Sequence, residues 1–233
     1  MARLDTFSIG EPLGDPSPHS YSAAEVSVMA TAADEALSCQ RELNRAGRNI
    51  VGEILEGQGA FVQLDHYPKG DVYDGESGSQ VYYHAHRREE HGHFHLFHRP
   101  PQDNRPGEVK TPSHLVAISM DRWGAPIGLF TTNRWVTGER WRSAEEVIAL
   151  ATGFRIDHDR PSWLVNRWIT AMVKCCRPQI DTLLRHRDRE IARLLADQGD
   201  AIYEDRRIEV IGQLPLHLPH WCKILQDVLT SPG

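Results

Sequence analysis

Two short stretches of this chain alternate between apolar and histidine side chains with a period of two, as β-strands do. In the first, the apolar members share one side and the histidines the other: Val81, Tyr83 and Ala85 against His84 and His86. The second sets Phe94 and Leu96 against His93 and His95 in the same way. The polar residues 89–92 lie between the stretches, and Gly92 can supply a positive φ there. The pattern predicts a β-hairpin.

The register of this hairpin follows from the burial of one face. A loop with an even number of residues places the apolar residues of both strands on one face and all four histidines on the other, whereas an odd loop mixes them. Because burial of one face fixes the register strongly, the sequence favours the even loop. Opposed residues on paired strands have Cβ atoms roughly 4.5–5.5 Å apart, which brings the imidazoles close enough to share one ion.

The histidines of the hairpin predict a metal site. Six of the 13 histidines of the chain fall in this segment: His84, His86, His91, His93, His95 and His98. We expect His84, His86 and His95 to be ligands, with His93 or Glu90 as a fourth. Two histidines with a carboxylate suit iron(II), and three histidines with an open position suit catalytic zinc. The alternatives are a solvated polar face, or histidines that each bond a neighbouring hydroxyl or carbonyl group.

The same segment resembles the first motif of the cupin superfamily. Gly78 is followed after five residues by His84, then by His86, and after three more residues by Glu90. The resemblance implies that His84, His86 and Glu90 bind iron(II) or manganese. It is local: Phe97 stands where the motif closes with glycine, and no second motif with its own histidine follows. The expected cofactor is therefore a divalent ion of iron, zinc or manganese.

Arginines near the hairpin indicate that the substrate is an anion. Arg87 and Arg99 flank it, and Arg134 follows the last predicted strand of the sheet. Guanidinium groups beside a metal suit a carboxylate or phosphate substrate. The alternative is that these charges only discourage sheet edges from aggregating.

Net charge and cysteine use limit the partners and the compartment. The chain of 233 residues has a formal net charge of −6, which argues against non-specific binding to nucleic acid. No stretch is long and apolar enough to cross a membrane, and the N-terminus lacks the apolar core of a signal peptide. None of the four cysteines forms a Cys-x-x-Cys pair, so free thiols in the cytoplasm are expected. The expected partner is a small-molecule substrate, and the oligomeric state is not predicted.

The order of the predicted elements gives the fold class. Residues 1–21 look like an arm that is flexible or lies on the surface, and a single domain spans 22–233. That domain divides into a helical segment (22–57), a sheet (60–135) and a second helical part (143–233). A capping box at Ser22 opens the first helical segment, and Gly47 and Gly52 interrupt it. Successive strands without helices between them predict an antiparallel sheet and an α+β fold, with helices on its apolar face and the imidazole face open to a pocket.

Within these parts, periodicity predicts the individual elements. The strands expected besides the hairpin are 60–67, 114–121, 127–132 and 207–214. The later helices are 143–153, 161–173, 178–197 and 221–229. Loops are expected at 68–78 and 100–113.

The histidine hairpin leads to one functional hypothesis and two alternatives. The first is a metal-dependent enzyme, an oxygenase or a hydrolase, that acts on a small acidic molecule. The second is a non-catalytic metal- or ligand-binding protein that uses the same histidines. The third is a metal-free domain in which the histidines form a pH-sensitive surface.

Overall fold

A computed structural model describes residues 7–14, 16–99 and 111–231. Their strands form one seven-stranded sheet in which every pairing is antiparallel, with the order β1-β7-β6-β5-β4-β3-β2. The strands are β1 (Phe7–Ser8), β2 (Tyr67–Tyr73), β3 (Ser79–His84), β4 (Gly92–His98), β5 (Ser113–Met120), β6 (Pro126–Thr132) and β7 (Val210–Pro215). Helices precede and follow strands β2 to β6 in the chain, and the structure confirms the α+β class.

Helices begin where the sequence provides caps. The helices are α1 (Ala23–Arg45), α2 (Ile50–Leu55), α3 (Arg134–Thr137), α4 (Ala144–Ala151), α5 (Trp163–Cys175), α6 (Arg177–Gln198) and α7 (Leu218–Thr230), with 3-10 turns at Pro18–Ser20 and Gly199–Glu204. Both predicted capping boxes are formed, by Ser22 with Glu25 and by Ser143 with Glu146. The segment 22–57 is two helices, because α1 ends at Arg45 just before the left-handed Gly47. No helix among these residues has the length and apolar character that a membrane span requires.

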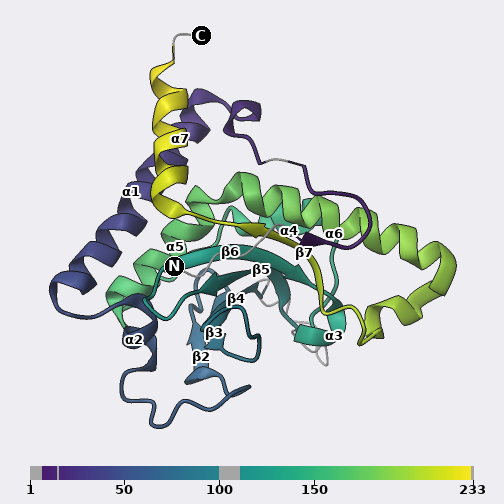
Figure 1. The fold of residues 1–233 in the computed structure, drawn as a ribbon, viewed down its shortest axis with the longest axis horizontal. Helices are drawn as coiled ribbons and strands as arrows, with labels where there is room; N and C mark the ends of the chain where they lie inside the picture. Colours follow the sequence, from purple (N-terminus) through teal and green to yellow (C-terminus); the bar gives the residue numbers. More distant parts are fainter. Residues whose placement is uncertain (1–6, 15, 100–110, 232–233) are drawn as a thin grey trace.

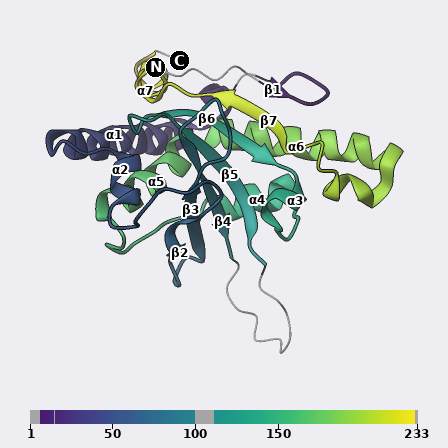
Figure 2. The same ribbon diagram turned by 60° about the horizontal axis from the view of Figure 1, so that its bottom comes forward.

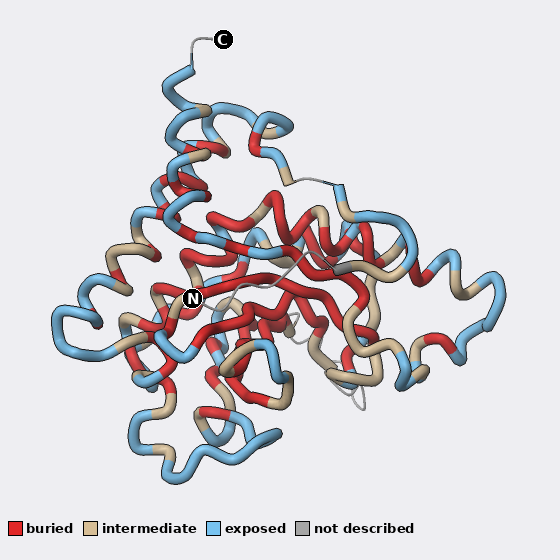
Figure 3. The backbone as a smooth tube through the Cα atoms, viewed as in Figure 1, coloured by how far each residue is buried: buried red, intermediate tan, exposed pale blue. Residues whose placement is uncertain are grey.

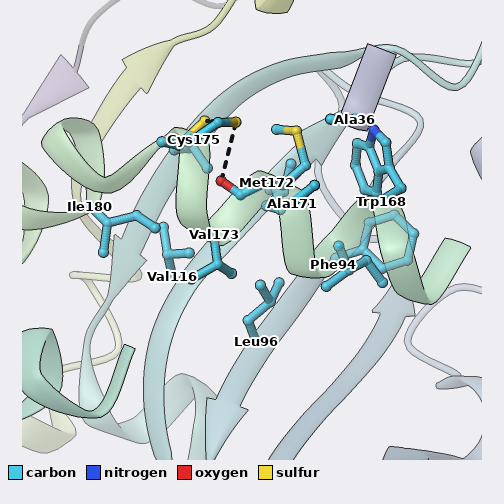
Figure 4. Packing of buried hydrophobic residues seen from close by; sticks show 14 of the residues in the cluster. Ala36, Phe94, Leu96, Val116, Trp168, Ala171, Met172, Val173, Cys175 and Ile180 are labelled. Carbon is cyan, nitrogen blue, oxygen red and sulfur yellow. Dashed lines mark hydrogen bonds between the residues drawn. The ribbon is translucent and has the colours of Figure 1, made fainter. Parts of the chain in front are cut away.

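The helices cover one face of the sheet (Figures 1 and 2), where α4 and α6 pack on the central strands and α5 lies beneath α1. The main cluster of buried apolar side chains lies between these layers and includes members of α1, α5, α6, α7 and strands β2 to β7. In this cluster, the ring of Trp168 on α5 packs against that of Phe94 on β4, with ring centroids 5.7 Å apart (Figure 4). Burial is complete in the middle of the sheet (Figure 3), since every residue of β3, β4, β5 and β6 is buried.

The prediction of a strand at 60–67 was wrong. Residues 60–66 form no strand, and β2 instead occupies part of the segment expected to be a loop at 68–78. The Tyr67 hydroxyl donates to the Ala60 carbonyl and accepts from the Val62 amide, so the chain curls around that side chain, and Leu64 takes a positive φ of 69°. As an edge strand, β2 accommodates Pro68 and Gly70.

Other differences lie at the ends of the sheet. Residues 7–8 of the predicted arm pair with β7 as strand β1, and Arg134–Thr137 form a short helix where the sequence predicts no helix. The predicted helix at 221–229 begins earlier, at Leu218, because His217 caps it and Pro219 is compatible with its first turn. Residues 1–6 of the arm and 100–110 of the predicted loop 100–113 lie outside the described residues.

Candidate metal centre

The hairpin of β3 and β4 has the even loop that the sequence predicts, but β3 ends at His84, so Ala85 and His86 lie beyond the strand to which they were assigned. His84 pairs with His93 and Tyr82 with His95, while Tyr83 pairs with Phe94 and Val81 with Leu96. The second group belongs to the buried core under the helices. The histidines therefore share the opposite face of the sheet, as the even loop requires.

Gly92 is needed in the hairpin for a different reason from the predicted one. Its φ is not positive, because it already belongs to the extended strand β4. A Cβ atom at this position would lie 2.5 Å from the Tyr83 hydroxyl and 2.6 Å from the His84 carbonyl oxygen. Only glycine allows the two strands to approach so closely here.

Imidazole nitrogens from both strands converge on one point. One nitrogen from each of His84, His86 and His93 lies within 4.8 Å of the other two. The Nε2 atoms of His84 and His93 are 2.7 Å apart, and His95 Nε2 lies 3.1 Å from that of His93. Ligands about 2.0–2.1 Å from a tetrahedral zinc ion lie roughly 3.3 Å from one another, so small movements of these rings would accommodate one.

A carboxylate bonds the outer nitrogen of one of these rings, and a second carboxylate lies near another ring. The buried Glu90 side chain reaches back from the turn and accepts a hydrogen bond from His93 Nδ1, and Glu209 Oε1 lies 3.6 Å from His86 Nδ1. A carboxylate on one imidazole nitrogen fixes the tautomer that leaves the other nitrogen free to bind a metal. Glu90 thus contacts the outer nitrogen of His93, whereas the resemblance to cupins implies that it is a ligand.

Burial keeps the imidazoles in the form that binds metal ions. It lowers the pKa of His84 to about 2, with help from His93 and His86, and lowers the pKa of His93 and His95 well below the ordinary value. These rings are therefore neutral near pH 7, and each has a nitrogen lone pair to donate. His84 Nδ1 is buried and has no hydrogen-bond partner among the described residues.

A second line of groups extends the cluster along the sheet. His95 Nδ1 lies 3.0 Å from His114 Nε2 on β5, and the Glu139 carboxylate accepts a hydrogen bond from the His114 backbone amide. Burial raises the pKa of the Glu139 carboxyl to about 7 and lowers that of His114 to about 3. His114, Glu139 and Glu209 were not among the site residues predicted from the sequence. Of the three, His114 alone had a sequence feature that could place it near the hairpin, since it opens a predicted strand of the sheet.

The three predicted substrate-binding arginines lie in different places. Arg87 lies against the cluster, with its guanidinium 4.4 Å above the Phe130 ring and Nη1 3.6 Å from Glu90 Oε2. Arg99 donates from Nε to Gln80 at the other end of the hairpin. Arg134 pairs with Glu204 and stacks on Tyr203. Of the three, Arg87 contacts Glu90, the residue that bonds His93.

The sequence predicts that the imidazole face opens to a pocket, but among the described residues its histidines are largely covered. His84 is 7% exposed, and His93 and His95 are almost fully buried. Residues 60–66 and 85–91 fold over this face, joined by a bond from the Leu64 amide to the Ala85 carbonyl, and the His66 ring stacks on Tyr82. The His86 side chain is 22% exposed, so the cluster meets solvent at this residue.

Replacing Glu90 with glutamine is expected to weaken zinc binding about tenfold, because the amide keeps the shape of the side chain but loses the charge that supports His93. Competition for zinc against a chromophoric chelator measures the change. Glu89→Gln is the matched control, since Glu89 is exposed and adjacent. Equal affinities for the two variants would show that Glu90 does not support the ligand.

Comparisons with known proteins place the chain in one family. A family model described as "Domain of unknown function (DUF6969)" matches residues 30–216. The matched part includes strands β2 to β7 and the entire histidine cluster. No curated protein and no solved structure matches the chain.

Proposed function

The chain belongs to the DUF6969 family, and we propose from its own geometry that it is a metal-dependent enzyme, a hydrolase or an oxygenase, that acts on a small acidic molecule. The proposal depends above all on the convergence of nitrogens from His84, His86 and His93 within 4.8 Å of one another. Histidines that converge on one point, one of them bonded on its outer nitrogen to a carboxylate, are an arrangement that protein metal sites use.

The donor set favours zinc and hydrolysis over iron. Three imidazoles with an open position are typical of catalytic zinc, whereas non-haem iron enzymes use two histidines and one carboxylate. Glu90, the nearest carboxylate, accepts from the outer nitrogen of His93 and would have to leave it to become a ligand. A zinc ion held by these rings supplies a water molecule with a pKa near neutrality.

Arg87 supports an acidic substrate. Its guanidinium lies beside Glu90, and Nη1 is buried without a hydrogen-bond partner among the described residues. A carboxylate or phosphate group that reached this position would satisfy that donor and compensate its charge.

Elemental analysis of protein purified without an affinity tag tests the proposal. We expect about one equivalent of a divalent transition metal per chain. In the cobalt-substituted protein, azide is expected to change the visible spectrum, because an open coordination position accepts an external anion. Protein that neither contains such a metal nor takes up cobalt would refute the proposal.

The burial of the cluster favours a second candidate, a non-catalytic metal-binding protein. His93 and His95 are almost fully covered, and a closed site with no open position needs no access for substrate. A cobalt spectrum that is insensitive to azide would support this function instead. A pH-sensitive histidine surface has less support, because these imidazoles are buried and burial keeps their pKa values far below 7.

A further inference from the structure

A groove of about 860 Å³ opens beside the candidate metal centre. Its walls are the hairpin turn at 85–91, the turn at 121–123 between β5 and β6, and residues Phe61 and Gln63. Two of its lining residues, Arg87 and Glu90, also belong to the surroundings of the histidine cluster, since Glu90 bonds His93 and Arg87 lies beside Glu90. The groove is therefore continuous with the groups that support the metal ligands.

Unpaired positive charge gathers in this groove. Arg88 and Arg122 are exposed, and neither has a hydrogen bond or an ion pair to any described residue. Of the three acidic side chains that line the groove, Glu90 is fully buried against His93, and Asp121 is only 3% exposed and binds the amides of Trp123 and Ala125. Glu89 is exposed, so an anion that entered the groove would meet two exposed arginines and one exposed carboxylate.

Aromatic faces accompany the arginines. The Trp123 side chain is 70% exposed and Phe61 is 40% exposed, although most large apolar residues of the chain are buried. The Phe61 ring stacks on His91 with centroids 5.3 Å apart and planes 13° from parallel, and that contact holds the ring at the groove. Flat apolar surfaces beside guanidinium groups suit a ligand that is both planar and anionic.

We propose that this groove is the substrate subsite and that it binds an aromatic carboxylic acid. The carboxylate lies on Arg88 and Arg122, and the ring lies against Trp123 and Phe61. This inference rests on the proposed function in calling the ligand a substrate, but binding in the groove does not require the metal.

Isothermal titration calorimetry of metal-free protein with 2-naphthoate tests the subsite. Neutral 2-naphthamide and saturated decahydro-2-naphthoate are the matched probes for the charge and for the ring. We expect 2-naphthoate to bind more tightly than both. The double variant Arg88→Gln with Arg122→Gln is expected to weaken its binding about tenfold, because two exposed charge pairs are lost. The control is Arg189→Gln with Arg193→Gln, which removes the same charge from exposed positions on α6.

Three results would overturn the subsite: no binding of 2-naphthoate, equal binding of the neutral amide, or an unchanged affinity in the double variant. Elemental analysis of untreated protein keeps the two proposals apart. Naphthoate binding by a protein that neither contains metal nor takes up cobalt would support the subsite and refute the metal enzyme. A stoichiometric metal without naphthoate binding would do the reverse.

Discussion

Replacing His84 and His86 together with alanine is expected to reduce the bound metal from about one equivalent to less than about a tenth of an equivalent. The substitutions remove two of the three nitrogens that converge, and each comes from the β3 side of the hairpin. His93 and His95 of β4 remain. A metal ion bound to these two imidazoles would have no ligand from the first strand of the hairpin. Elemental analysis after dialysis measures the loss.

The fold of this double variant is expected to remain. The core that joins sheet and helices lies on the other face of β3, where Val81 and Tyr83 are unchanged. Removing the His84 ring takes away the contact of its Nε2 with His93, but His93 keeps Glu90 at Nδ1 and His95 at Nε2. Far-UV circular dichroism should therefore match that of the unmodified protein. The matched control is His19→Ala with His220→Ala, at two exposed positions outside the sheet, and it should keep its metal. Stoichiometric metal in the His84 and His86 variant would exclude this site.

Local alternation was enough to predict the hairpin and the face on which its histidines lie. Val81, Tyr83, Phe94 and Leu96 can be buried on one face only if the loop is even, and the structure has an even loop. The helix starts at Ser22 and Ser143 were predicted for a similar reason, because a capping box is contained in four consecutive residues. Features set by neighbours in the sequence were therefore accessible.

Features set by distant residues were not. His114 reaches His95 only because β5 pairs with β4, and Glu209 reaches His86 from the approach to β7, more than 100 residues along the chain. The alternation of residues 60–67 is that of a strand, but the Tyr67 hydroxyl bonds the backbone at Ala60 and Val62 and bends the segment. No property of these residues taken alone distinguishes the two outcomes.

Replacing Trp168 with alanine is expected to lower the free energy of unfolding by about 3–5 kcal/mol, because a large, fully buried side chain leaves a cavity that its neighbours fill only in part. Trp168 lies between α5 and the sheet, against Phe94 (Figure 4). Urea unfolding in the presence of a chelator measures the change without a contribution from bound metal.

Two variants separate the cavity from other effects of removing this tryptophan. Trp163→Ala, on the same helix but 45% exposed, is expected to cost only about 0.5 kcal/mol. Trp168→Phe is expected to cost much less than Trp168→Ala, because it keeps an aromatic ring and Trp168 Nε1 has no hydrogen-bond partner among the described residues. Similar losses for Trp168→Ala and Trp163→Ala would contradict the packing described.

The same substitution connects the core to the metal centre. Phe94 lies between His93 and His95 on β4, with its ring on the helix side and theirs on the opposite face. Packing by Trp168 therefore holds the stretch of strand from which both imidazoles project. Trp168→Ala should also weaken zinc binding in the folded protein, whereas Trp163→Ala should not. An unchanged zinc affinity in Trp168→Ala would show that the strand is held in place by its hydrogen-bonded neighbours alone.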